Sequence, residues 1–161
     1  MQKITVIGCP GSGKSTFSRA LRDKLGLPLH YLDILWHKPD RTNVTREEFD
    51  EKLIKILKGE KWIIDGNFNR TLEMRVNACD TVFLLDFPVE VCLSGVESRI
   101  GKKREEMPWV EEEFDPEFKE WIINFPKDKL PYIYQILEKY NDKNIIIFKS
   151  REEMSEFLSR L

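Results

Sequence analysis

Histidine and cysteine are scarce in this chain, with only two and three copies among 161 residues. Cys9, Cys79 and Cys92 are odd in number, far apart and without CxxC spacing or nearby histidines, so neither a disulfide framework nor a zinc site is expected. We predict buried thiols, with Cys9 reactive only if helix amides lower its pKa. His30 and His37 have no metal-ligating neighbours, and we interpret them as structural or incidental.

An excess of positive charge is also missing. Lys and Arg number 26 against 28 Asp and Glu, which gives a formal net charge of -2. The one basic cluster, at 102–104, is followed at once by two glutamates, and no helix-turn-helix, zinc or basic-aromatic motif is present. Direct nucleic-acid binding is therefore not expected.

Long apolar runs are absent. No segment approaches the roughly 18 to 20 apolar residues that a membrane-spanning helix needs, and residues 1–7 lack the charged start, apolar stretch and cleavage site of a signal peptide. We expect a cytoplasmic protein without membrane contact. The length favours a single domain over 1–161, and the sequence leaves the oligomeric state open.

Five short apolar runs alternate with helical patterns along the chain. The strands are expected at 4–7, 28–33, 62–66, 81–86 and 144–148, and the helices at 17–25, 45–58, 89–100, 116–140 and 151–161. A capping box of Thr45 and Glu48 opens the second helix, and Pro126 and Pro131 are expected to split the fourth. This alternation predicts the α/β class, with a parallel sheet covered by helices on both faces.

Aromatic and apolar side chains mark helix faces in the last third of the chain. Phe114, Phe118, Trp121 or Ile122, and Phe125 recur every three or four residues, and we interpret this stripe as core packing. The terminal helix is expected to turn Met154, Phe157, Leu158 and Leu161 inward.

A glycine-rich motif lies between the first strand and the first helix. Residues 8–15 read GCPGSGKS and match G-x-x-x-x-G-K-[ST] in the strand-turn-helix context that the motif requires. Its glycines let backbone amides turn toward phosphate oxygens, and the helix N-terminus adds partial positive charge. The motif predicts binding of a nucleoside triphosphate, ATP, through Gly8, Pro10, Gly11, Ser12, Gly13, Lys14, Ser15 and Thr16.

Two side chains of the motif have distinct expected roles. Lys14 can reach the β- and γ-phosphates, and the Ser15 hydroxyl can bind Mg²⁺, which bridges the same oxygens. The metal also needs a nearby carboxylate, and Asp65, at the end of an apolar strand, is the first choice. Asp33 is the second candidate, for substrate or metal contact or for loop capping, and Asp86 is expected to be a helix N-cap.

The chain resembles the small-molecule and nucleoside-monophosphate kinases, the group of adenylate kinase, shikimate kinase and gluconate kinase. It is more closely similar to bacterial proteins called DNA topology modulation proteins. The segments that carry this resemblance cover most of the chain and are residues 8–16, 32–36, 62–68 with Arg70 and Arg75, and 78–86.

The resemblance implies a three-layer α/β/α fold, a five-stranded parallel sheet in the order 2-3-1-4-5 and a mobile lid at about 101–116. It also implies that Arg70, after Asp65 and Gly66, contacts the acceptor's phosphate. Arg75 would hold an anionic group of the acceptor or pair with an acid.

The basic residues after the fourth strand fall where these kinases keep lid arginines. By this resemblance, Arg99, Lys102 and Arg104 would close on the phosphates, with Arg99 contacting the nucleotide and Arg99 and Arg104 stabilising the transition state. We predict direct in-line transfer of the γ-phosphate from Mg-ATP to a small acceptor, possibly a nucleotide, with Asp33 or Asp65 orienting or deprotonating that acceptor.

Two other function classes could use the same motif. A GTPase would need a guanine-reading N-K-x-D segment, which residues 141–144 do not supply. The alternative that stays open is a nucleotide-regulated binding protein that affects DNA topology without kinase turnover.

Overall fold

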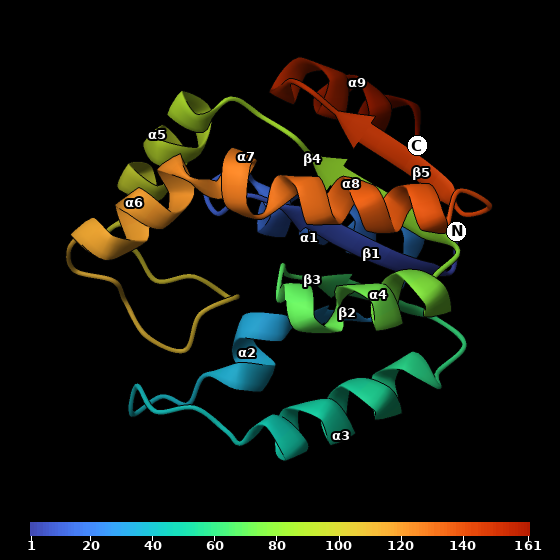
Figure 1. Ribbon diagram of the computed structural model, residues 1–161, viewed down its shortest axis with the longest axis horizontal. Coiled ribbons are helices and arrows are strands. Elements are labelled where there is room, and N and C mark those ends of the chain that lie inside the picture. Colours follow the sequence, from blue (N-terminus) through green and yellow to red (C-terminus); the bar gives the residue numbers. More distant parts are fainter.

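The five apolar runs form one parallel sheet in the computed structural model, which describes residues 1–161 (Figure 1). The strands are β1 (Lys3–Gly8), β2 (Leu29–Tyr31), β3 (Trp62–Asp65), β4 (Thr81–Leu85) and β5 (Asn144–Phe148). Their order is β2-β3-β1-β4-β5, and every neighbouring pair is parallel. The expected order 2-3-1-4-5 is therefore confirmed.

Helices cover both faces of the sheet (Figure 1). Helices α1 (Lys14–Leu25) and α9 (Arg151–Arg160) lie on one face, and α4 (Asn69–Ala78) and α8 (Leu130–Lys139) lie on the other. The remaining helices are α2 (Leu32–Trp36), α3 (Arg46–Leu57), α5 (Val89–Arg99), α6 (Pro116–Ile123) and α7 (Phe125–Asp128). The three-layer α/β/α architecture is thereby confirmed, and none of the helices combines the length and the apolar composition needed to cross a membrane.

Aromatic packing fixes α1, the helix that follows the glycine-rich motif, against the sheet. The Phe17 ring meets Phe83 of β4 edge-on at 4.9 Å between centroids and Phe148 of β5 at 5.5 Å. All three rings are buried. Edge-to-face contacts of this kind add about 0.5 to 1.5 kcal/mol beyond the burial of apolar area. The N-terminus of α1 is therefore attached to the most deeply buried part of the molecule.

Several helix boundaries agree with the sequence patterns. The Glu48 amide donates to the Thr45 hydroxyl at 3.1 Å, so the N-cap of α3 is confirmed. Pro126 and Pro131 lie in the first turns of α7 and α8, and they divide the long helical segment as expected. Proline is tolerated there because its missing N–H would have had no partner within the helix.

Three local expectations were wrong. Strand β2 ends at Tyr31, and Asp33 lies in the first turn of α2 rather than at the end of a strand. Pro88 occupies the N-cap position of α5, while the Asp86 carboxylate accepts hydrogen bonds from Tyr134 and Lys149, each at 2.5 Å. Leu161 is 38% exposed because α9 ends before it.

Candidate functional site

The glycine-rich motif forms a loop between the end of β1 and the start of α1. Gly8 lies against β4, where an added Cβ would be 2.8 Å from the carbonyl oxygen of Leu85. Gly13 has φ 101°, no side chain caps α1 at this position, and an added Cβ there would meet nothing within 4 Å. An uncapped helix N-terminus facing open space is a suitable binding site for phosphate oxygens.

The hydroxyl of Ser15 and the carboxylate of Asp65 meet at the site. Ser15 Oγ donates to Asp65 Oδ2 at 2.7 Å. The two residues come together because β1 and β3 are adjacent parallel strands, with Val6 opposite Asp65, so the first turn of α1 follows the same sheet edge. A hydroxyl and a carboxylate oxygen are hard ligands of the kind that Mg²⁺ takes together with phosphate oxygens, so the donor set fits a Mg²⁺ ion bound with ATP.

Asp65 is almost completely buried, with 4% of its surface exposed. Burial raises its pKa from 3.8 to about 6, although the Lys14 ammonium and the Ser15 hydroxyl act in the opposite direction. A carboxylate that is destabilised by burial gains more from a bound cation than an exposed one does. The electrostatics of the site therefore favour a metal ion at this carboxylate.

A cleft of about 800 Å³ opens beside the loop at 8–15, which we call the phosphate loop. It brings together Lys14, Ser15, Asp33, Asp65, Arg99 and Arg104 from segments far apart in the sequence. In Figure 1 the carboxyl ends of the strands point toward α2, α5, α6 and the segment between α5 and α6. The size lies within the range of small-molecule sites, about 300 to 1,000 Å³.

The aromatic stripe of α6 is only partly core. Ile122 and Phe125 are buried as expected. Phe118 is half-buried and Trp121 is 38% exposed, and both line the cleft. The helical spacing could not show this difference, because the face of α6 that continues the core stripe also borders the cleft.

Acidic residues of the segment between α5 and α6 pair with the arginines at the cleft. Arg104 pairs with Glu106 at 3.3 Å and with Glu111, and Arg99 lies 3.8 Å from Glu111. Arg19 of α1 approaches Glu106 from the other side at 3.0 Å. Burial lowers the pKa of Arg99, whose Nε has no partner. Lys102, which we expected to act with the two arginines, is exposed and does not line the cleft.

The two arginines expected at the acceptor are occupied elsewhere. Arg75 has no exposed surface and donates to the carbonyl oxygens of Gly66, Asn67 and Phe68. Burial lowers its pKa to about 9. It therefore neither meets an acceptor nor forms an ion pair, because the preceding loop turns its carbonyls onto the guanidinium. Arg70 binds Asp50 through both terminal nitrogens, at 2.8 and 3.1 Å, outside the cleft lining.

Other motif residues contribute to the shape of the loop. Ser12 is buried with an unpaired hydroxyl, whereas Thr16 is exposed and lies 3.4 Å from a nitrogen of Arg19. Pro10 lines the cleft. Arg151, at the start of α9, donates to the carbonyl oxygen of Gly11 at 3.3 Å. The loop is thus supported from a helix at the far end of the chain.

Sequence reasoning missed several residues of the cleft. Asn67 accepts a hydrogen bond from the Gly8 amide at 3.1 Å and so ties β3 to the phosphate loop. Its position directly after Asp65 and Gly66 could have indicated that Asn67 lies at the site. His37 and Trp109 line the cleft and contact each other at 5.0 Å between ring centroids. Glu106 carries no such signal, because a glutamate in a charged segment looks like exposed surface.

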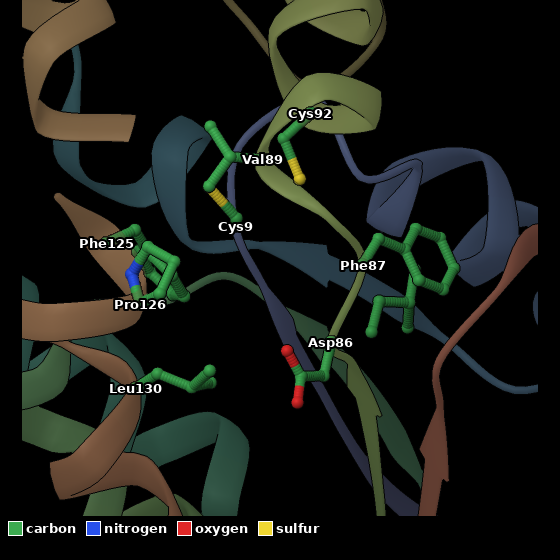
Figure 2. A pocket seen from close by; sticks show the side chains of 9 residues that line it. Cys9, Asp86, Phe87, Val89, Cys92, Phe125, Pro126 and Leu130 are labelled. Atoms are coloured by element: carbon green, nitrogen blue, oxygen red, sulfur yellow. The ribbon is translucent and has the colours of Figure 1, made fainter. Parts of the chain in front are cut away.

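A much smaller pocket, of about 10 Å³, lies behind the phosphate loop (Figure 2). Cys9 and Cys92 line it from the loop and from α5, together with Asp86 and Leu130. The adjacent Cys92 thiol and burial raise the pKa of Cys9, so the idea that helix amides activate this thiol is wrong. All three cysteines are buried and free, as expected.

Comparisons with known proteins agree with this geometry. Residues 4–120 match the family model described as AAA domain, and none of the curated proteins matches the sequence. Shikimate kinase from Acinetobacter baumannii in complex with shikimate is similar in structure, with a TM-score of 0.66 and 13% identity over 99% of this chain and 90% of that one.

Two further solved structures give the same result. A sugar kinase from Janibacter sp. HTCC2649 has a TM-score of 0.56 and 16% identity over 99% of this chain and 91% of that one. Shikimate kinase from Aquifex aeolicus has a TM-score of 0.55 and 21% identity over 98% and 92%. At these identities the likeness establishes a shared P-loop kinase fold.

Proposed function

This chain belongs to the AAA domain family, and on that premise we propose that it is a kinase that transfers the γ-phosphate of ATP to a small-molecule acceptor. One observation carries the proposal: the Ser15 hydroxyl and the Asp65 carboxylate meet at 2.7 Å, in the cleft that Lys14 also lines. This combination supplies two metal ligands and a cation at the position where the β- and γ-phosphates of ATP would lie. ATP as the donor and Mg²⁺ as the metal are parts of the proposal.

Each residue has a separate part in the proposed reaction. Backbone amides of the loop and the Lys14 ammonium hold the triphosphate, and Ser15 with Asp65 holds Mg²⁺. When bound, the ion would neutralise the phosphate oxygens and orient them for in-line attack. Arg99 and Arg104 would stabilise charge on the transferred group after leaving their glutamate partners.

Asp33 is the proposed base, because Asp65 is committed to Ser15 and the metal. Its half-buried carboxylate lines the cleft, and burial raises its pKa. An acceptor oxygen would attack the γ-phosphorus as its proton passes to Asp33. The bond from the γ-phosphorus to the bridging oxygen would break, and its electron pair would leave with ADP.

The alternative, a nucleotide-regulated protein that acts on DNA topology, has no specific observation in its favour. Carboxylates outnumber cations both in the whole chain and around the cleft, which opposes the binding of a polyanion.

The test incubates the purified protein with Mg-ATP and a panel of nucleoside monophosphates, nucleosides, sugars and hydroxy acids. Turnover is measured by the release of ADP. At least one acceptor should stimulate ADP release in the native protein and not in Lys14→Ala. If ATP binds and no acceptor raises turnover above slow hydrolysis, the kinase function is refuted and a nucleotide-gated binding role replaces it.

A further inference from the structure

The charge around the cleft argues against a second phosphate in it. Carboxylates outnumber cations by six to four among the lining residues, which are Asp33, Asp65, Glu106, Glu111, Asp115 and Glu117 against Lys14, Arg99, Arg104 and Lys129. Three of these cations are assigned to the triphosphate in the proposed mechanism. Unlike-charge complementarity sets specificity in binding sites, and juxtaposed like charges cost several kcal/mol, so a phosphorylated acceptor would meet a site with little positive charge left.

The arginines that would bind an acceptor's phosphate are not in the cleft. Arg75 is fully buried beneath the carbonyls of residues 66–68, and Arg70 is held by Asp50. Lys129 is the remaining cation, and its ammonium lies 5.9 Å from the centre of the Trp121 ring. A single lysine is a hydrated point charge without the two-pronged geometry with which arginine binds phosphate.

Aromatic rings line the part of the cleft formed by the lid and α6. Trp121 is 38% exposed, and Phe118 stacks on it at 6.4 Å between centroids. Trp109 of the lid contacts His37 at 5.0 Å. Large aromatic side chains that stay partly exposed inside a cleft offer faces on which a ligand ring can stack.

The carboxylate of Asp33, the proposed base, has no side-chain partner in the protein. The Asp33 carboxylate forms no ion pair or hydrogen bond with another side chain, and Lys14, His37 and Arg99 are close enough to stabilise its charge. An unpaired carboxylate inside a cleft is suited to receive a proton from a hydroxyl group. A phosphate acceptor, whose oxygens are already ionised at neutral pH, would have no use for such a base and would be repelled by it.

We propose, on the premise of the kinase function above, that the acceptor is an uncharged ring compound bearing a hydroxyl group, of the nucleoside or sugar kind, and not a phosphate monoester. The hydroxyl would face Asp33, and the ring would lie against the aromatic side chains of the lid and α6. This inference departs from the expectation that Arg70 contacts a phosphate of the acceptor and that Arg75 holds an anionic group of the acceptor or pairs with an acid.

Matched pairs of acceptors test the inference. Adenosine, cytidine, thymidine and glucose are each compared with their own monophosphate, with Mg-ATP at a fixed saturating concentration, and kcat/KM is measured by ADP release and by mass spectrometry of the product. For at least one pair, kcat/KM for the uncharged member should be tenfold or more above that for its phosphate. The identity of that pair then shows whether the acceptor is a nucleoside or a sugar. A preference for monophosphates, or turnover only with the hydroxy acids of the wider panel, overturns the inference and leaves the kinase function intact. No turnover with any member of either set refutes both.

Two variants extend the test to the residues. Trp109→Ala should raise KM for the uncharged acceptor at least fivefold with KM for Mg-ATP changed less than twofold. Arg70→Ala should leave the acceptor's KM unchanged, since that side chain lies outside the cleft. A tenfold rise in KM caused by Arg70→Ala, or none caused by Trp109→Ala, would contradict the proposed acceptor site.

Discussion

Gly95 of α5 lies directly against the phosphate loop, and the contact there is backbone to backbone. A Cβ added at Gly95 would be 2.0 Å from the carbonyl oxygen of Gly11 and 3.0 Å from its Cα. From the other side, a Cβ added at Gly11 would be 2.0 Å from the carbonyl oxygen of Cys92. No side-chain rotation can relieve such an overlap, so Gly95→Ala must displace either α5 or the loop.

Two opposing effects determine the result of Gly95→Ala. In the interior of a helix, alanine is more favourable than glycine by roughly 0.8 to 1 kcal/mol. Ordinary contact begins at 3.4 Å, so relief of the 2.0 Å contact requires a shift of about 1.4 Å, and overpacking commonly costs about 1 to 3 kcal/mol or more. The balance lowers the free energy of unfolding by about 1 to 2 kcal/mol. We expect the affinity for Mg-ATP to fall at least tenfold, because the phosphate-binding amides move with the loop.

Urea unfolding and calorimetric titration with Mg-ATP measure these two quantities. Ser94→Ala is the matched control, since Ser94 is the exposed neighbour on the same helix and its replacement should be neutral or slightly stabilising. If Gly95→Ala is as stable as Ser94→Ala and binds Mg-ATP equally well, α5 does not hold the phosphate loop as described.

Three further predictions concern buried charged side chains. Because burial raises the pKa of Asp65 from 3.8 to about 6 in the metal-free protein, protonation should compete with Mg²⁺ and lower kcat/KM for Mg-ATP about tenfold per pH unit below about pH 6. The same shift stabilises the folded state below about pH 4, a contribution of up to about 3 kcal/mol that is lost as the pH rises to 6. A pH series of kcat/KM and of urea unfolding checks both trends; Asp65→Asn should flatten the unfolding trend and lower kcat/KM at every pH. Arg75→Met should lower the free energy of unfolding by about 2 to 4 kcal/mol because buried carbonyls lose their donor, and a loss under about 0.5 kcal/mol would show that these bonds matter little. Glu106→Gln should lower KM for Mg-ATP about threefold by removing one of the two carboxylates that pair with Arg104, and steady-state kinetics with an unchanged or higher KM would contradict the view that the glutamate competes with the nucleotide.

Local patterns predicted the strands and the loop at 8–15 well, because both depend on short stretches of chain, whereas the strand order was implied by the family resemblance. The motif at 8–15 and the apolar lead-in to Asp65 each lie within one element, and parallel pairing of β1 with β3 brings them together. Proline positions likewise set the boundaries of α7 and α8.

The roles of the charged side chains could not be predicted in the same way. Arg75 looked like a ligand for an anion, yet the fold places it under three carbonyl oxygens. Glu106 looked like solvated surface, yet it is 7% exposed and paired with arginines from two elements. These roles depend on contacts between residues far apart in sequence, and a pattern within one segment contains no information on its partners.

Transfer of labelled phosphate tests the central claim most directly. ATP carrying a labelled γ-phosphate is incubated with Mg²⁺, the native protein and the best acceptor of the panel, and the label is followed into the acceptor and into free phosphate. The account predicts that the label appears on the acceptor in step with ADP and that Lys14→Ala abolishes it. Label found only as free phosphate, at a rate that no acceptor changes, would contradict the assignment of this cleft as a phosphotransfer site.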